Sequence, residues 1–194
     1  MMKIPVSNTN APVWRDITVK SELPARLKPL DELAKNLWWV WNSEAKTLFR
    51  NLNPDLWRKT GENPVMLLQQ LTSDRIAEIL ADSDLMAEIN RVYADFKEYM
   101  SKPMRKDIPS VSYFSMEYGL CNCLKIYSGG LGVLAGDYIK EASDSCVDMT
   151  AVGFLYRFGY FTQTLSVDGQ QIANYEPQNF NQLPIEQVME ADGR

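Results

Sequence analysis

The chain has 194 residues, of which 45% are hydrophobic and 23% charged, as is typical of a soluble globular protein of one or two domains. Its net charge of −5 argues against binding to nucleic acid or to an anionic membrane, which would need clustered lysine and arginine. No apolar stretch has the length of a signal-peptide core or a membrane span, so we expect a cytoplasmic protein. The sequence contains no histidine, which excludes Ser-His-Asp and Cys-His catalytic arrangements built from this chain alone.

The chain has three cysteines, Cys121, Cys123 and Cys146. This number is small for a disulfide framework and, being odd, would leave one cysteine unpaired. Cys121 and Cys123 could contribute to a soft-metal site. Without histidine, however, the other ligands would have to be Cys146 and carboxylates. We therefore expect free thiols and no metal.

The first half of the chain predicts helices after a loose N-terminal arm. The arm covers residues 1–25 and includes a short strand at 14–19. From residue 26 to residue 42, apolar side chains recur at helical spacing and predict one helix. Further helix starts are predicted by residues typical of N-caps at Ser43, Asn63, Ser73 and Ser83. Because Lys102-Pro103 ends the last of these helices, we expect a helical module over residues 26–102.

A strand, a glycine turn, a helix and a second strand follow. Residues 111–116 and 149–156 have the β-branched and aromatic content of buried strands. Between them, the glycine cluster that begins at Gly129 opens a predicted helix. Its apolar stripe consists of Leu131, Leu134, Ala135, Tyr138, Ile139 and Ala142. This order predicts a βαβ unit, and the free N–H groups at the start of its helix can hold an anion.

The remaining residues predict a hairpin and an unfinished fold. Asp168-Gly169 is a turn signal between two short polar strands. One βαβ unit and one hairpin leave strand edges unpaired and one sheet face uncovered. The predicted fold class is therefore α/β, and we expect residues 110–194 to begin a larger domain that the chain does not complete.

The spacing of the glycines allows several interpretations. Gly130-x-Gly132-x-x-Ala135 fits the dinucleotide fingerprint. A dozen residues separate the glycines from the first strand, and Asp148 stands at the start of the second strand instead of its end, which argues against a nicotinamide or flavin enzyme. No Gly-Lys-Ser/Thr follows, which excludes a P-loop. Spacing alone leaves open a turn with only a structural role.

Longer segments closely resemble the α-glucan (glycogen and starch) phosphorylases of the short bacterial and archaeal type. These segments are Phe114–Leu120, Ile126–Asp137, Lys140–Asp144 and Ala151–Phe161. The helical part also resembles the module that precedes the catalytic domain in those enzymes, through Asn36–Asn42, Leu48–Phe49, Asn53–Trp57 and Asn63–Val65. The resemblance runs from about Leu27 to the C-terminus.

This resemblance implies a GT-B fold, in which two Rossmann-like domains enclose the active site. The implied reaction transfers a terminal α-1,4-linked glucosyl unit to inorganic phosphate and gives glucose 1-phosphate. The partners are therefore an α-1,4-glucan and inorganic phosphate, with no nucleic acid and no membrane. The implied cofactor is pyridoxal 5′-phosphate, whose phosphate group takes part in proton transfer.

The resemblance also implies roles for residues of the glycine turn. Gly129, Gly130, Leu131 and Gly132 would bind the cofactor phosphate, and Gly130 and Leu131 would also bind the glucosyl or phosphate group. The cofactor lysine and the basic phosphate clamp have no counterpart in these 194 residues. We therefore expect no catalytic residue here and no activity from this chain alone. Relatives often carry His followed by an acidic residue near Cys121, so the sequence departs from the family there.

Three tryptophans could stack on sugar rings. Helical spacing places Trp38 and Trp41 in the core and leaves Trp39 as the candidate glucan-binding surface. For Glu117 we expect a hydrogen-bonding role, and for Arg157 a salt bridge.

Two other functions stay open at this point. One is a nucleotide-sugar-dependent glucan synthase. Such enzymes usually carry a lysine two residues before the glycines, where this chain has Tyr127. The other is a non-catalytic glucan-binding module.

Overall fold

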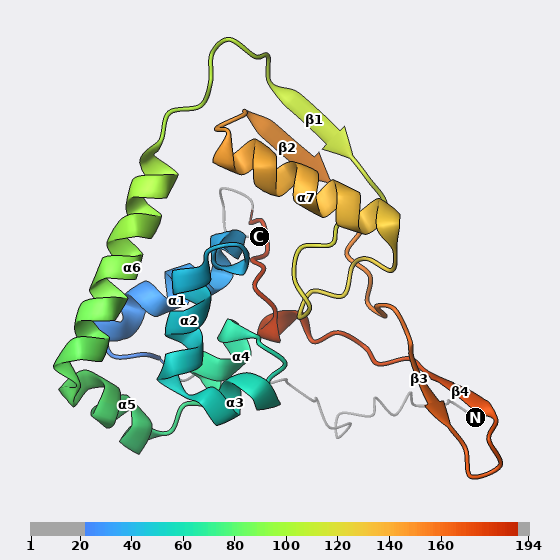
Figure 1. Ribbon diagram of the computed structural model, residues 1–194, viewed down its shortest axis with the longest axis horizontal. Helices are drawn as coiled ribbons and strands as arrows, with labels where there is room; N and C mark the ends of the chain where they lie inside the picture. Colours follow the sequence, from blue (N-terminus) through green and yellow to red (C-terminus); the bar gives the residue numbers. More distant parts are fainter. Residues whose placement is uncertain (1–21, 190–194) are drawn as a thin grey trace, which may run out of the picture.

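A computed structural model describes residues 22–189 and shows a helical part, a βαβ unit and a projecting hairpin (Figure 1). The strand predicted at 14–19 lies outside the described residues. The described part combines helices with a few strands, so the α/β fold class is confirmed. None of its helices is long and apolar enough to span a membrane.

The helical part begins with η1 and ends with the long helix α6. Its elements are η1 (Ala25–Leu27), α1 (Lys28–Lys35), η2 (Leu37–Val40), α2 (Ser43–Leu52), α3 (Pro54–Lys59), α4 (Pro64–Gln69), α5 (Ser73–Ala81) and α6 (Ser83–Ser101). Figure 1 shows α6 along one side of this part, with α1 and α2 beside it.

Most of these helices begin with a side-chain cap. At three of them the capping residue lies one position before the predicted one. The residues whose side chains accept first-turn N–H groups are Asn42, Asn53, Asn63, Thr72 and Asp82. Ser43, Ser73 and Ser83 are instead the first helical residues. The helix α3 was not predicted, although Asn53-Pro54 is the same cap-and-proline signal as Asn63-Pro64.

The single helix predicted over residues 26–42 is wrong. α1 ends at Lys35, and Asn36 takes an extended conformation with φ −93° and ψ 124°. The Asn36 side chain accepts a hydrogen bond from the N–H of Trp38 at 3.0 Å, which starts the separate turn η2. This break changes the direction of the tryptophans that follow, so that Trp38 and Trp39 are both buried.

The core of the helical part is built on aromatic and leucine side chains. Phe49 and Trp57 stack with ring centroids 6.1 Å apart, and Trp39 meets each of them edge-on at 6.1 Å. Leucines of η1, α1, α2 and α4 complete this core together with Ile89, Val92 and Phe96 of α6.

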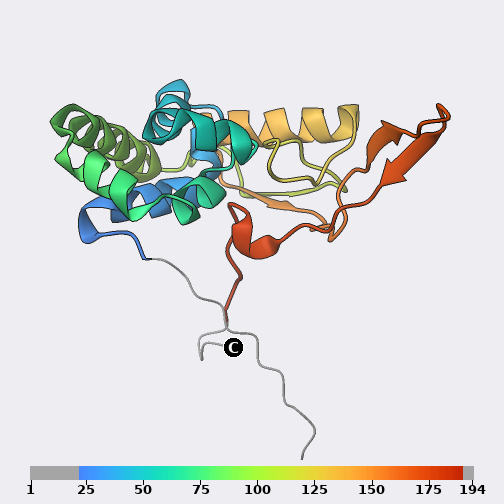
Figure 2. The same ribbon diagram turned by 90° about the horizontal axis from the view of Figure 1, so that it is seen from below.

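The βαβ unit is confirmed. It consists of β1 (Val111–Phe114), α7 (Gly130–Asp144) and β2 (Met149–Val152). The strands pair in parallel, from Val111 opposite Met149 to Phe114 opposite Val152. Figure 2 shows α7 lying on one face of this pair. Both strands end earlier than predicted.

The predicted hairpin is also confirmed. Strand β3 (Thr162–Leu165) pairs antiparallel with β4 (Gln171–Asn174). Gly169 has a φ of +74° in the connecting turn, a conformation that glycine adopts without strain. The hairpin projects away from both other parts (Figure 1), and the short turn η3 (Phe180–Gln182) follows it.

The predicted apolar stripe of α7 is wrong in part. Ala135 and Ala142 are buried, but Leu131, Leu134 and Tyr138 are exposed, Leu134 to 69%. Gly132 and Gly136 are buried in their place, because the main chain of Gly119 packs directly against Gly136 and the Tyr127 side chain packs against Gly132. The smallest residues therefore face inward, where they permit this approach.

Candidate anion-binding site at the glycine turn

The glycine turn forms an open helix N-terminus. α7 begins at Gly130, and Gly129 at the N-cap contributes no side-chain cap. Within the described part of the chain, the N–H groups of Gly130 and Leu131 have no protein acceptor. A Cβ added at Gly129 or Gly130 would meet nothing within 4 Å, so the turn is open on this side. Free N–H groups at the positive end of a helix dipole are suited to an anion.

The carboxylate of Glu117 holds the turn from the other side. Its Oε1 accepts a hydrogen bond from the Ser128 hydroxyl at 2.7 Å, and its Oε2 accepts from the Ser128 N–H at 3.2 Å. The Ser128 hydroxyl, and after it the Ser128 N–H, holds the pKa of Glu117 below its ordinary value; the N–H groups of Gly129 and Gly132 add to this effect. Glu117 is therefore ionised at neutral pH, and the hydrogen-bonding role expected for it is confirmed.

A buried tyrosine positions the loop that carries Glu117. The Tyr118 hydroxyl lies 2.8 Å from the main-chain oxygen of Tyr113 in β1 and 3.1 Å from that of Val152 in β2. The next residue, Gly119, donates its N–H to the oxygen of Gly132 in α7 at 2.6 Å. The loop is thus fixed to both strands and to the helix. Sequence reasoning missed this role of Tyr118, although a tyrosine so close to a strand end was a usable signal.

The tryptophans do not contribute to this site. Trp39 is only 2% exposed, and it packs edge-on against Phe49 and Trp57 in the helical core. The prediction that Trp39 is a surface for glucan stacking is therefore wrong, because the break at Asn36 turns this side chain inward. Trp38 is buried, as predicted.

Two side chains of the helical part contact the end of α7, and sequence reasoning missed both contacts. Trp41 is only partly buried, and its Nε1 donates to Asp144 Oδ1 at 3.0 Å. The Tyr99 hydroxyl of α6 lies 2.7 Å from the same oxygen. Among residues 22–189, Arg157 makes no ion pair, so the salt bridge expected there is not found.

Helical elements thus precede a βαβ unit whose helix presents an open glycine N-terminus, which defines an α/β protein with a candidate anion site. The chain belongs to the family described as "protein of unknown function (DUF3417)", whose sequence profile matches residues 23–124.

Relatives of known name agree with the resemblance seen in the sequence. The chain is 38% identical over 191 residues to a glycogen phosphorylase of Mycobacterium tuberculosis, covering 92% of this chain and 22% of that protein. It is 39% identical over 183 residues to a maltodextrin phosphorylase of Thermococcus litoralis, covering 91% and 22%. It is 41% identical over 167 residues to a glycogen phosphorylase of Aquifex aeolicus, covering 84% and 24%.

The resemblance to the α-glucan phosphorylases is therefore confirmed. The chain spans less than a quarter of the length of these relatives. No solved structure matches the chain significantly.

Proposed function

We propose that the chain is the N-terminal part of an α-glucan phosphorylase and contributes the glycine turn to its active site. The whole protein would transfer a terminal α-1,4-linked glucosyl unit from a glucan to inorganic phosphate and release glucose 1-phosphate. The observation that carries the proposal is the open N–H pair of Gly130 and Leu131 in a chain whose relatives are named glycogen and maltodextrin phosphorylases.

The same proposal covers the architecture. Residues 26–102 would be a helical module, and residues 110–194 would begin the first Rossmann-like domain of a GT-B fold. The parallel β1–β2 pair supports this view, as do the exposed apolar side chains of Phe114, Leu134 and Phe154, which further elements of a longer protein would cover. The cytoplasmic location expected from the sequence belongs to this proposal too.

The residues of the turn fit the phosphate group of pyridoxal 5′-phosphate or of a substrate. Two free N–H groups belong to consecutive residues at a helix N-terminus, and the absence of a Cβ leaves room for close approach at Gly129 and Gly130. Gly130 and Leu131 would hold this group through their free main-chain N–H donors, and Gly129 and Gly132, whose N–H groups act on Glu117, would border it with bare main chain. When bound, the cofactor would supply a phosphate that takes part in proton transfer.

Glu117 would position the turn and would not itself bind an anion. Its negative charge repels phosphate, so an anion would lie against Gly130 and Leu131, away from the Ser128 side. By fixing Ser128, Glu117 keeps the free N–H groups in one orientation before any ligand arrives. Such preorganisation is the main contribution that main-chain donors make to catalysis.

The chain supplies only part of this site. It contains no counterpart of the cofactor lysine or of the basic phosphate clamp implied by the resemblance, so we expect it to be inactive without the rest of the protein. A nucleotide-sugar-dependent synthase is disfavoured by Tyr127, which stands where a lysine is usual. A glucan-binding module loses its main support because Trp39 is buried.

Phosphorolysis by the full-length protein tests the proposal. With pyridoxal 5′-phosphate bound, maltooligosaccharide and phosphate should yield glucose 1-phosphate, measured by a coupled dehydrogenase assay. Gly130→Ala should lower kcat/KM by about tenfold or more, because a methyl group displaces the bound anion. The matched control is Asp137→Ala, an exposed change on the same helix, which should leave activity unchanged.

Two results would contradict the proposal. Absence of product from the cofactor-loaded wild type would exclude a phosphorylase. Full activity of Gly130→Ala would exclude the turn from the active site.

A further inference from the structure

Two thiols lie in contact on the loop that leads from β1 to the glycine turn. The Sγ atoms of Cys121 and Cys123 are 3.2 Å apart, and both cysteines are free. They belong to a tight turn in which the N–H of Leu124 donates to the oxygen of Cys121 at 3.3 Å. Both side chains are partly buried and keep some exposure to solvent.

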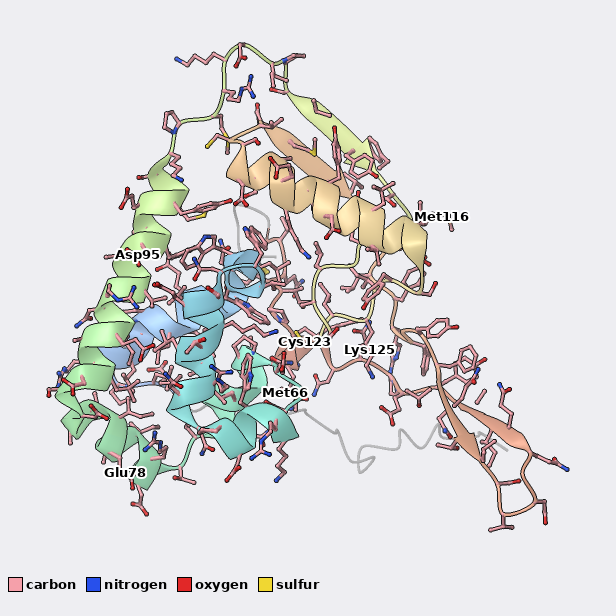
Figure 3. The ribbon with its side chains drawn as sticks, in the orientation of Figure 1. Met66, Glu78, Asp95, Met116, Cys123 and Lys125 are labelled. Carbon is pink, nitrogen blue, oxygen red and sulfur yellow. The ribbon has the colours of Figure 1, made fainter. Side chains whose placement is uncertain are left out.

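This pair lies where the helical part meets the βαβ unit. Cys121 packs against the buried residues of both parts, and Cys123 packs against the core of the helical part. Figure 3 shows Cys123 on the loop between the helical part and α7. Two residues before Cys121, Gly119 is bound to the main chain of α7. A change in the turn would therefore act on contacts of both parts.

The two thiols differ in acidity. The contact with Cys123 lowers the pKa of the Cys121 thiol, and the positive charge of Lys140 acts in the same direction. The same pairing raises the pKa of Cys123, and burial raises it further. Because the thiolate is the reactive form, Cys121 is the nucleophile of the pair and Cys123 the partner that reacts second.

We propose that Cys121 and Cys123 form a redox-modification site that hydrogen peroxide converts into an intrachain disulfide. The Cys121 thiolate attacks one peroxide oxygen, the O–O bond breaks, and with one proton the products are a sulfenic acid and water. The Cys123 sulfur then attacks the sulfenic sulfur. The S–O bond breaks, and the hydroxyl group leaves as a second water with the Cys123 proton. Each sulfur loses one electron, and the peroxide gains two.

The geometry permits this bond with a small movement. Cα atoms two residues apart are separated by at most about 7 Å even in an extended chain, and a turn brings them within the usual disulfide range. The Sγ atoms must approach from 3.2 Å to about 2.05 Å, a contraction of roughly 1 Å. This contraction would pull the turn away from one of the two cores, so oxidation would also alter their junction. The proposal does not depend on the phosphorylase function.

Peptide mapping of the full-length protein tests the site. Reduced protein is treated with one equivalent of hydrogen peroxide, alkylated under denaturing conditions and digested with trypsin. Cys121 and Cys123 fall in the tryptic peptide Asp107–Lys125, and Cys146 falls in Glu141–Arg157. We expect both thiols to be lost from the first peptide, recovery of both by dithiothreitol, and alkylation of Cys146 throughout.

Single variants distinguish this mechanism from general oxidation. Cys123→Ser should stop at a sulfenic acid on Cys121, trapped by dimedone, whereas Cys121→Ser should leave Cys123 reduced. Cys146→Ser is the matched control and should behave as the wild type. If one equivalent of peroxide oxidises Cys146 first, or leaves both thiols of the Asp107–Lys125 peptide open to alkylation, the proposal is overturned.

Discussion

Replacing Gly136 with alanine tests the close contact between α7 and the loop that carries Glu117. The added Cβ would lie 2.2 Å from the oxygen and 2.7 Å from the carbonyl carbon of Gly119. Ordinary contacts begin at 3.4 Å, so the nearest one is short by about 1.2 Å. Both atoms are main chain, and the same residue donates its N–H to Gly132 at 2.6 Å. Helix and loop must therefore separate for the methyl group to fit.

Three contributions determine how much Gly136→Ala should weaken the packing of α7 against the loop. Overpacking costs about 1–3 kcal/mol, and loss of the Gly119–Gly132 hydrogen bond adds about 1 kcal/mol. Alanine is favoured over glycine inside a helix by about 1 kcal/mol, which offsets the second term. The free energy that holds α7 against the loop should thus fall by about 1–3 kcal/mol. Gly130→Ala is the matched control: its Cβ meets nothing within 4 Å, and its stability should stay within about 0.5 kcal/mol of the wild type.

Hydrogen exchange resolved by peptide measures this local opening in the full-length protein. Amides of α7 in Gly136→Ala should exchange about 5–150 times faster than in the wild type, which corresponds to 1–3 kcal/mol. The same amides in Gly130→Ala should exchange at the wild-type rate. Equal rates in the two variants would refute the close contact and, with it, the placement of the glycine turn by Gly119.

Substitutions at three residues test the helical part. Asn63→Ala should lower the free energy of unfolding by about 2–3 kcal/mol in urea titrations, because Asn63 caps α4 and its Nδ2 also donates to the Gln182 oxygen at 2.7 Å. Trp39→Ala should lower the free energy of unfolding by about 3–5 kcal/mol in the same titration. Trp39→Phe should lower it much less, because the buried indole N–H has no partner to lose among residues 22–189. Burial raises the pKa of Tyr99 to about 12 from 10.0, so stability should fall as the pH rises from 10 to 12, and Tyr99→Phe should lack this fall in its unfolding midpoints.

Each of these changes has an outcome that contradicts it. Asn53→Ala is the control for Asn63→Ala, because Asn53 caps α3 but makes no bond like the one from Asn63 to Gln182. It should lower the free energy of unfolding by about 1 kcal/mol. If Asn63→Ala lowers it by the same amount, the bond to Gln182 contributes nothing. Loss of retention on a glycogen resin by a folded Trp39→Phe variant would restore a sugar-binding role for this residue. An alkaline decline that persists in Tyr99→Phe would assign it to another group.

The elements with a strong local signal could be predicted from the sequence. The βαβ unit follows from two β-branched segments around a glycine-initiated helix, and the hairpin follows from Asp168-Gly169. The glycine turn was found in the same way, because its residues are adjacent in the chain. The Glu117–Ser128 contact was not found, since eleven residues separate the two and only the folded loop brings them together.

The orientation of α7 could not be predicted, because hydrophobicity identifies the wrong face. Leu131 and Leu134 are the more apolar residues, yet Gly132 and Gly136 are buried. A side chain at Gly136 would collide with the main chain of Gly119, and one at Gly132 would collide with Tyr127. A residue-by-residue hydrophobicity pattern has no term for such a contact between main chains. Trp39 was misplaced for a different reason: the Asn36 side chain competes with the helix for the N–H of Trp38, and this break shifts the periodicity of the residues that follow.

The separation into two cores also gives the chain an order of folding. Within the described part of the chain, every buried residue of the helical core lies between Leu27 and Phe96, so this core can form without a buried residue from the βαβ unit. The β1–β2 pair must instead close a loop from Val111 to Met149, a separation of 149 − 111 = 38 residues. During synthesis, the helical part emerges complete before β2 exists. The loop with the glycine turn can therefore close against a surface that has already folded.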